Sequence, residues 1–399
     1  FMQSGAVTTR SAQDELHKGL GRLRDHARAF FTELAFGHRN GERARGEERV
    51  RATDSSLAHT REVAAYLAGS LDLVEAALAL LRPAGSGDGE TPSTPFDGMA
   101  LAKRAGEIRD ELRFLLRASD PAYVYFVEFR GKGVFLRAAP IDVSTIIRDL
   151  LLDRMRGTVL TSATLTVDGR FEYVKERLGI DQAEEVTLPS EFDYTRQALL
   201  YLPPRMPDPR SQDFTMAAGR QVIELLKRSQ GRAFVLFTSY ASLRAVQAIV
   251  EMALEYPMLV QGTAPRSQLL KQFRETPNSV LFATSSFWQG VDVVGDALSC
   301  VIVDKLPFAS PADPITAARI EAIRARGGEP FSEYQVPLAI LALQQGLGRL
   351  IRHRRDRGVL AILDPRTRTM GYGRRFIASV PPAPVVQDLD AVEAFFSIV

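Results

Sequence analysis

The chain has 399 residues, of which 45% are hydrophobic and 25% are charged, and its formal net charge is +2. This length is enough for two or three domains, and the composition is ordinary for a soluble globular protein. The nearly balanced charge does not by itself indicate a polyanionic partner, although the basic residues are clustered locally. A single cysteine, Cys300, excludes an internal disulfide and a four-thiolate iron–sulfur or zinc site within this chain.

No apolar run approaches the roughly 18 residues of a membrane span, and no signal peptide precedes the fold. We therefore expect a cytoplasmic protein with no membrane partner. The five histidines show no metal-ligand spacing, so we expect no metal site built by this chain alone.

The N-terminal part predicts helices. Apolar residues recur at helical spacing over residues 10–35 and again over 63–81, with a polar Arg/Glu-rich turn between these two stretches. A third helix is predicted around residues 108–115, after the Pro/Gly/Ser-rich loop PAGSGDGETPSTPF at 83–96. We expect an all-helical module over residues 1–118, which either only packs or guides a nucleic acid.

From residue 122 the hydrophobic period changes from 3.6 to 2. The runs YVYFVEF and VFLRAAP flank Arg130-Gly131-Lys132-Gly133, which predicts a hairpin. A helix near 142–154 then leads to TVLTSATL, which is apolar enough to predict a strand.

The rest of the chain alternates strand and helix patterns, which predicts the α/β class with a doubly wound parallel sheet and right-handed crossovers. Six strands are predicted, at ALLYLP (198), AFVLFTS (233), MLVQG (258), SVLFATS (279), LSCVIVD (298) and GVLAILD (358). Ligands of such sheets bind at the carboxyl ends of the strands, so we expect the functional polar residues to lie there.

The strongest candidate site is the stretch QQGLGRLIRHRRDR at 344–357. Arg349 and Arg352 are three residues apart, and we expect them on one face of a helix whose first turn contains Pro337. A planar guanidinium is always charged and matches phosphate oxygens, so a rigid pair suits a triphosphate. Gly348 leaves room for another backbone to approach. The alternative is a solvated basic face that closes a helix.

Hydroxyl side chains end two of the predicted strands. Ser162 and Thr164 lie in TSATL, and Thr238 and Ser239 close AFVLFTS. Small hydroxylated residues can donate to phosphate oxygens without crowding a backbone. They can also cap helices: an N-cap for a helix starting at Ala241 is the alternative for the second pair, and both roles can hold at once.

The block SSFWQGVDVVG at 285–295 carries one carboxylate, Asp292, in an otherwise apolar run. An unpaired charge in such a run would be costly, so we expect Asp292 to pair with Arg349, with Arg352 or with a ribose hydroxyl. Gly290 in the same block permits a tight turn or a close backbone approach.

Taken together, these motifs resemble those of the DinG branch of the XPD-like superfamily 2 DNA helicases. TSATL is similar to helicase motif III, VLFTSYASL to motif IV, SFWQGVDVVGDAL to motif V and QGLGRLIR to motif VI, and VIVDKLPFASPADP and LDPR are also typical of the branch. The resemblance covers roughly residues 120–399, with the motifs in the family order. One departure is Gln289, where many relatives carry glutamate.

The resemblance implies an arch-like helical module at 1–118, a remnant of a first motor domain at 119–190 and a RecA-like second helicase domain at 191–399. It implies 5′-to-3′ translocation on single-stranded DNA in repair or replication, powered by ATP and Mg²⁺. Arg349 and Arg352 would then be arginine fingers on the γ-phosphate. Further residues on the nucleotide side would be Gln345, Gly348, Gly290 and Asp292. Four hydroxyl residues would serve the DNA: Ser162 and Thr164 by coupling nucleotide state to the track, Thr238 and Ser239 by touching the strand.

Two motifs of such helicases are absent from this sequence: G-x-x-x-x-G-K-[ST], which cradles the phosphates, and Asp-Glu-Ala-His, which holds Mg²⁺. We therefore expect the C-terminal portion of a helicase, whose partner is a missing N-terminal helicase domain. Catalysis needs both walls of the nucleotide site, so we expect no ATP hydrolysis by this chain alone. The alternatives are a non-catalytic module that binds single-stranded DNA or a partner, and an unrelated doubly wound enzyme.

Overall fold

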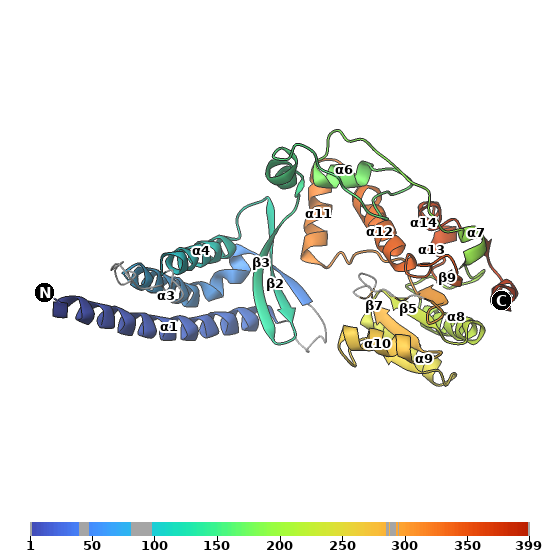
Figure 1. Cartoon of the computed structure of the whole chain (residues 1–399), viewed down its shortest axis with the longest axis horizontal. Helices are drawn as coiled ribbons and strands as arrows, with labels where there is room; N and C mark the ends of the chain where they lie inside the picture. The colour runs from blue at the N-terminus through green and yellow to red at the C-terminus, as the bar shows by residue number, and fades with distance from the viewer. Residues whose placement is uncertain are drawn as a thin grey trace, which may run out of the picture. The chain divides into compact units, whose positions relative to one another are not determined.

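The computed structural model divides into two compact units (Figure 1). The N-terminal unit comprises Phe1–Asp142 with Ser310–Ala322, and the C-terminal unit comprises Val143–Ala309 with Ile323–Val399. Side chains are described from Asp14 onward. The residues that the structure describes are 2–39, 48–80, 98–284, 287, 293 and 295–397.

The N-terminal unit packs helices against one face of a small antiparallel sheet. The three long helices are α1 (Met2–His38), α3 (Arg61–Leu80) and α4 (Gly98–Arg117), and the short α2 (Asp54–Leu57) and η1 (Ala58–Thr60) precede α3. The sheet has the order β1 (Glu48–Ala52), β2 (Tyr123–Arg130), β3 (Gly133–Pro140). Phe30 and Leu34 of α1 meet Tyr125 and Val127 of β2 in its core, so the predicted helices and the hairpin are confirmed.

The prediction of an all-helical module missed β1. Its sequence ERVRA lies where a polar turn was expected, and it pairs antiparallel with β2, Val50 opposite Val127 and Ala52 opposite Tyr125. Arg49 and Arg51 alternate with these small apolar residues. Strand preference depends mainly on cross-strand neighbours, and these are supplied by a segment about 75 residues away in the sequence.

Among the described residues, one helical stretch, Asp54–Leu80, is long and apolar enough by composition to cross a membrane. Its residues Leu67, Leu71, Val74 and Leu78 are buried within the N-terminal unit, in clusters shared with α1 and α4. The core helix of a folded domain passes the same test of length and composition.

The C-terminal unit is built on a seven-stranded sheet in which every pairing is parallel. All six predicted strands form, and β10 is additional, so the α/β fold class is confirmed. The strand order is β10-β4-β9-β8-β5-β7-β6. The strands are β4 (Ala198–Tyr201), β5 (Ala233–Phe237), β6 (Met258–Val260), β7 (Val280–Thr284), β8 (Cys300–Val303), β9 (Gly358–Ile362) and β10 (Val385–Val386).

Both faces of this sheet are covered by helices. Along β5, Val235 and Phe237 enter one core cluster with α8 (Asp213–Ser229), α9 (Tyr240–Glu251) and α15 (Leu389–Ser397). The alternate residues Phe234 and Leu236 enter the other cluster with α10 (Arg266–Glu275), α12 (Val336–Leu347) and α14 (Gly373–Ser379). The remaining helices are α5 (Ser144–Ile147), η2 (Arg148–Leu152), α6 (Glu172–Leu178), α7 (Tyr194–Gln197), α11 (Pro314–Ala325), η4 (Phe331–Gln335) and α13 (Arg366–Thr369).

The strand predicted at TVLTSATL does not form. Residues 157–162 are irregular, and Val159 is 90% exposed although its sequence is typical of a buried strand. A central strand needs neighbours on both sides and cover on both faces, and this segment lies outside the seven-stranded sheet. Its apolar side chains are therefore left at the surface.

The turn before β5 depends on a glycine, which yields a stability prediction. Gly231 has φ +72, and a Cβ there would run into the carbonyl oxygen of Asn278. Gly231→Ala should lower the free energy of unfolding by on the order of 3 kcal/mol, measured by urea denaturation, because strain and a backbone clash add. Gly371→Ala, at a site with open space, is the control and should change it by less than about 0.5 kcal/mol.

Candidate functional site

The two candidate arginines lie just beyond α12. Pro337 is in the first turn of this helix, as predicted, and Gly348 is its C-cap, donating its N–H to the Gln344 carbonyl at 2.9 Å. Arg349 and Arg352 therefore occupy the turn between α12 and β9, and the prediction that they share a helix face is wrong. Gly348 favours a helix end, and a carboxylate takes the next backbone donors.

Asp356 fixes the shape of this turn. Its Oδ2 accepts hydrogen bonds from the backbone N–H groups of Arg352 at 2.8 Å and His353 at 2.7 Å. Gln197, the last residue before β4, donates from Nε2 to the carbonyls of His353 at 3.1 Å and Asp356 at 2.9 Å. The sequence reading missed both residues. Asp356 could have been found as the one carboxylate in the basic run QQGLGRLIRHRRDR.

Arg349 is also tied to the helix that precedes it. Its Nε donates to the Gln345 carbonyl at 3.2 Å, so the structure brings these two predicted site residues together. Arg349, Arg352 and Gln345 are half-buried, and Gly348 is exposed. Side chains held in this way have few rotamers to lose when a ligand binds, which favours recognition of a phosphate group.

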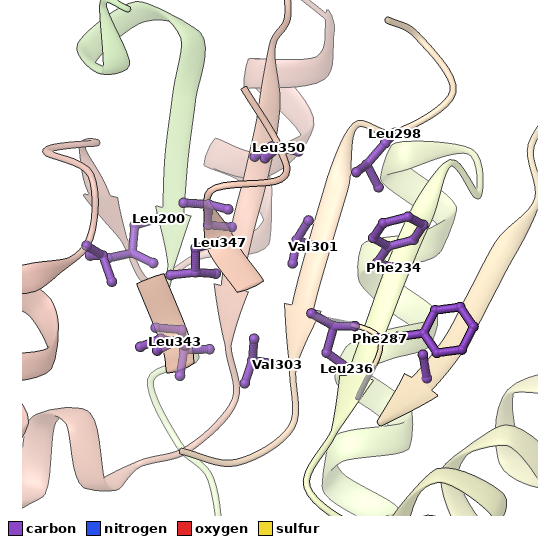
Figure 2. Close-up of a cluster of buried hydrophobic side chains, with 14 of the residues drawn as sticks. Leu200, Phe234, Leu236, Phe287, Leu298, Val301, Val303, Leu343, Leu347 and Leu350 are labelled. Carbon is purple, nitrogen blue, oxygen red and sulfur yellow. The ribbon is translucent and has the colours of Figure 1, made fainter. Parts of the chain in front are cut away.

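The arginine turn lies at the amino-terminal edge of the sheet, not at the carboxyl edge where the polar residues were expected. Leu350 packs against Gly358, the first residue of β9, so closely that a Cβ on Gly358 would lie 2.5 Å from its Cδ1. In Figure 2, Leu350 is near the same end of the sheet as Leu298, which precedes β8, whereas Leu343 lies toward Val303 at the end of that strand.

The second pair of predicted residues lies at the opposite, carboxyl edge. Thr238 and Ser239 follow β5, and the Ser239 hydroxyl accepts from the Ser242 N–H at 3.1 Å as the N-cap of α9. The alternative of a helix cap is thus confirmed for Ser239. Its side chain stays exposed, and Thr238 is half-buried. A phosphate contact by Ser239 is compatible with this cap, because helix N-termini also bind anions.

Two buried carboxylates, Asp304 after β8 and Asp364 after β9, organise this edge. Asp304 Oδ1 accepts from the N–H groups of Thr238 at 3.1 Å and Lys305 at 2.6 Å. Asp364 Oδ2 accepts from Leu306 N at 2.9 Å and pairs with Arg366. Both were missed, although a lone Asp directly after an apolar strand, as in CVIVD and AILD, is the signal that could have found them.

A third polar link at the same edge joins β6, β7 and α9. Gln261 accepts from the backbone N–H of Thr284 at 2.7 Å and donates to the Tyr240 hydroxyl at 2.6 Å. Thr284 ends β7, so Gln261 fixes the point at which the chain leaves this strand. The strand ends beside Thr238 are thereby held by side chains rather than by the sheet alone.

Ser162 and Thr164 lie in the irregular segment outside the sheet. The Thr164 N–H donates to Ser162 Oγ at 3.2 Å, and Ser162 lines an open cavity of about 990 Å³. The segment connects to α12 through Ser379, whose hydroxyl lies 3.4 Å from Asp168 Oδ1 and whose carbonyl accepts from Gln344 at 2.8 Å. Neither residue ends a strand here, in contrast to the prediction.

Two predicted residues, Gly290 and Asp292, lie outside the described residues. In the part of the chain that is described, no group of three His, Cys, Asp or Glu side chains is placed to hold a metal ion.

The environment of Asp304 gives a pH-dependent prediction. Burial raises the pKa of Asp304 to about 7, although the N–H groups of Lys305 and Thr238 oppose the shift. Between about pH 4 and 7 the folded chain keeps a proton that the unfolded chain releases, so the free energy of unfolding should fall as pH rises through this window. Above it the loss is complete, at on the order of 1.4 kcal/mol per pKa unit.

The measurement is urea unfolding of the unmodified chain and of Asp304→Asn at pH 5 and pH 8. Asparagine keeps an oxygen for Thr238 but cannot titrate, so the difference in stability between the two proteins should change sign-consistently in favour of the variant at pH 8. Identical pH dependence of both proteins would contradict the assignment.

Comparison with known proteins supports this description. The helicase C-terminal domain family matches residues 222–383. ATP-dependent DNA helicase YoaA of Escherichia coli (strain K12) is 42% identical over 299 residues, which are 75% of this chain and 47% of the relative. The 3′-5′ exonuclease DinG of Bacillus subtilis (strain 168) is 34% identical over 299 residues, 71% of this chain and 32% of the relative.

A solved structure of an XPD helicase matches with a TM-score of 0.56 at 15% identity, over 95% of this chain and 64% of that chain, which shows a shared fold. The chain spans about half the length, or less, of the curated relatives it matches. Over the residues that it shares with them, the chain belongs to the YoaA and DinG helicases, with their helicase C-terminal domain and an XPD-like fold.

Proposed function

We propose that this chain supplies the second motor domain of an ATP-dependent DNA helicase that translocates 5′ to 3′ on single-stranded DNA. Its sheet unit forms one wall of the ATP site, and a companion helicase domain with the phosphate-binding loop forms the other. The observation that carries the proposal is the arginine turn after α12, which Asp356 and Gln197 hold in one shape.

Arg349 and Arg352 would contact the γ-phosphate in this arrangement. A guanidinium presented by a fixed turn stabilises the charge that develops in phosphoryl transfer, and it needs no reorganisation at that moment. Gln345 and Gly348 lie at the start of the same turn, where they would line the nucleotide.

The DNA would lie along the carboxyl edge. Ser239 presents its hydroxyl and the N-terminus of α9, a 12-residue helix, to solvent. Backbone N–H groups and hydroxyls at such a position bind phosphates of any sequence, which suits an enzyme that moves along a strand. Thr238 is positioned for the same contact by Asp304.

Magnesium would be held largely by the companion domain. The described residues contain no group of three metal-ligating side chains, so this part of the chain does not form a metal site of its own. The ion supplies charge neutralisation between the phosphates when it is bound. The residues of this chain contribute fixed guanidinium groups on the other side of the nucleotide.

The exposed segment at 157–165 supports the presence of a companion domain. Val159 is exposed beside Leu160, and Leu188 and Val186 are exposed on the second stretch that lines the same cavity. Apolar patches of this kind indicate an interaction surface. We assign residues 119–190 to the boundary with the first motor domain on this ground.

The nucleotide role is tested by ATP hydrolysis. The chain alone should show no turnover, and a fusion behind the N-terminal half of the YoaA relative should hydrolyse ATP in the presence of single-stranded DNA. Arg349→Ala in the fusion should lower kcat by about 10³-fold or more, because the transition-state charge loses its partner.

Arg354→Ala is the matched control for this experiment. Arg354 belongs to the same turn, is exposed, and pairs with the exposed carboxylate of Glu191. Its removal should leave hydrolysis unchanged. ATP turnover by the chain alone that depends on Arg349 would overturn the shared site, and an unaffected Arg349→Ala fusion would overturn the arginine role.

The companion interface is tested by hydrogen exchange. The amides of residues 157–165 should exchange rapidly in the chain alone, because the segment makes no sheet hydrogen bonds here. In the fusion they should become protected as a strand forms. Equal exchange in both proteins would remove the support for a strand shared with the companion.

A further inference from the structure

The N-terminal unit has a sheet face that its helices do not cover and that is rich in arginine and phenylalanine. On β2 and β3 this face carries Glu128 opposite Phe135, and Phe126 opposite Arg137. On the other side of β2, Arg49 of β1 is opposite Glu128. The helices pack on the opposite face, which presents Tyr125, Val127 and Phe129. We name the uncovered set, defined by Arg49, Glu128, Arg130, Phe135 and Arg137, the hairpin face.

Glu128 is the centre of this face and is only 1% exposed. Arg49 Nε lies 3.0 Å from its Oε1, Arg137 Nε lies 2.7 Å from its Oε2, and Arg130 lies 3.7 Å away. Burial alone would raise the pKa of Glu128, but the hydrogen bond from Arg49 and the nearby guanidinium charges outweigh burial and lower it. The carboxylate therefore stays ionised and holds the arginines in place.

The face keeps a positive charge after this pairing. Asp313 takes a second contact from Arg49 at 3.3 Å, and Lys132 extends from the exposed turn between β2 and β3. The net charge is about +2, because two carboxylates, Glu128 and Asp313, oppose four cations, Arg49, Arg130, Arg137 and Lys132. Clustered cations on a rigid surface attract a polyanion.

An exposed aromatic ring stands in the middle of these cations. Phe135 is 39% exposed, and the Arg137 guanidinium lies over it at 5.1 Å from the ring centroid. Gly133 lets the ring lie against the end of the hairpin, since a Cβ there would come within 2.8 Å of it. A ring and a guanidinium plane fixed in this way are platforms for unpaired bases.

We propose that the hairpin face is a second binding site for single-stranded DNA, separate from the carboxyl edge of the C-terminal unit. Phe135 and Arg137 stack with bases, and Lys132 and Arg130 contact phosphates. The choice of DNA as the polyanion rests on the proposed function, whereas the preference for a single strand follows from the exposed ring, because bases in a duplex are already stacked.

The test is binding of fluorescein-labelled oligothymidine to the full chain, followed by anisotropy. Phe135→Ala should weaken binding about tenfold, and Arg137→Gln with Lys132→Gln should reduce the dependence of log K on log salt by roughly 0.7 for each cation removed. Controls in the same unit are Phe36→Ala, an exposed phenylalanine on α1, and Arg113→Gln, a similarly exposed arginine on α4; both should bind normally.

Phe135→Trp provides a readout that a purely structural role would not change. The unmodified chain has one tryptophan, so quenching by oligothymidine beyond that of the unmodified chain reports a base stacked at position 135. Unchanged affinity of Phe135→Ala, or no added quenching in Phe135→Trp, would overturn this site while leaving the proposed function in place. No binding of oligothymidine by the unmodified chain would overturn both.

Discussion

The arrangement of functional residues in this protein depends on a parallel sheet that is buried on both faces. Val235 and Phe237 of β5 point into one core and Phe234 and Leu236 into the other, so no strand interior has room for polar chemistry. Polar groups can lie only at the two edges, where the strands begin and end. The arginine turn occupies one edge and the hydroxyl residues occupy the other.

Buried polar side chains stabilise these edges. Asp304, Asp364 and Gln261 each accept backbone N–H groups at the carboxyl edge, and Asp356 and Gln197 do the same at the amino edge. A buried carboxylate is tolerated where it satisfies several donors that would otherwise be unpaired. The loops that face a ligand are therefore determined by residues that face away from it.

The sequence was sufficient for the fold of the C-terminal unit, because its strands are apolar runs separated by amphipathic helices. It also identified Arg349, Arg352 and Ser239, whose residue types carry their chemistry. It could not place the end of α12, since the Asp356 carboxylate competes for the backbone donors only once the turn has closed. Nor could it show β1 or the exposure of 157–162, because strand formation depends on neighbours that the local pattern does not name. Gly290 and Asp292 lie outside the described residues and stay predictions.

The position of the arginines and hydroxyls at opposite edges has a mechanical consequence. The five residues of β9 span about 17 Å at 3.3 Å each, and they are packed on both sides, so they resist bending. A force applied at the arginine turn is then transmitted along the strands without loss to local deformation. The sheet behaves as a stiff rod that carries displacement from one end to the other, and a stroke generated at a nucleotide would reach the DNA as movement of the whole body.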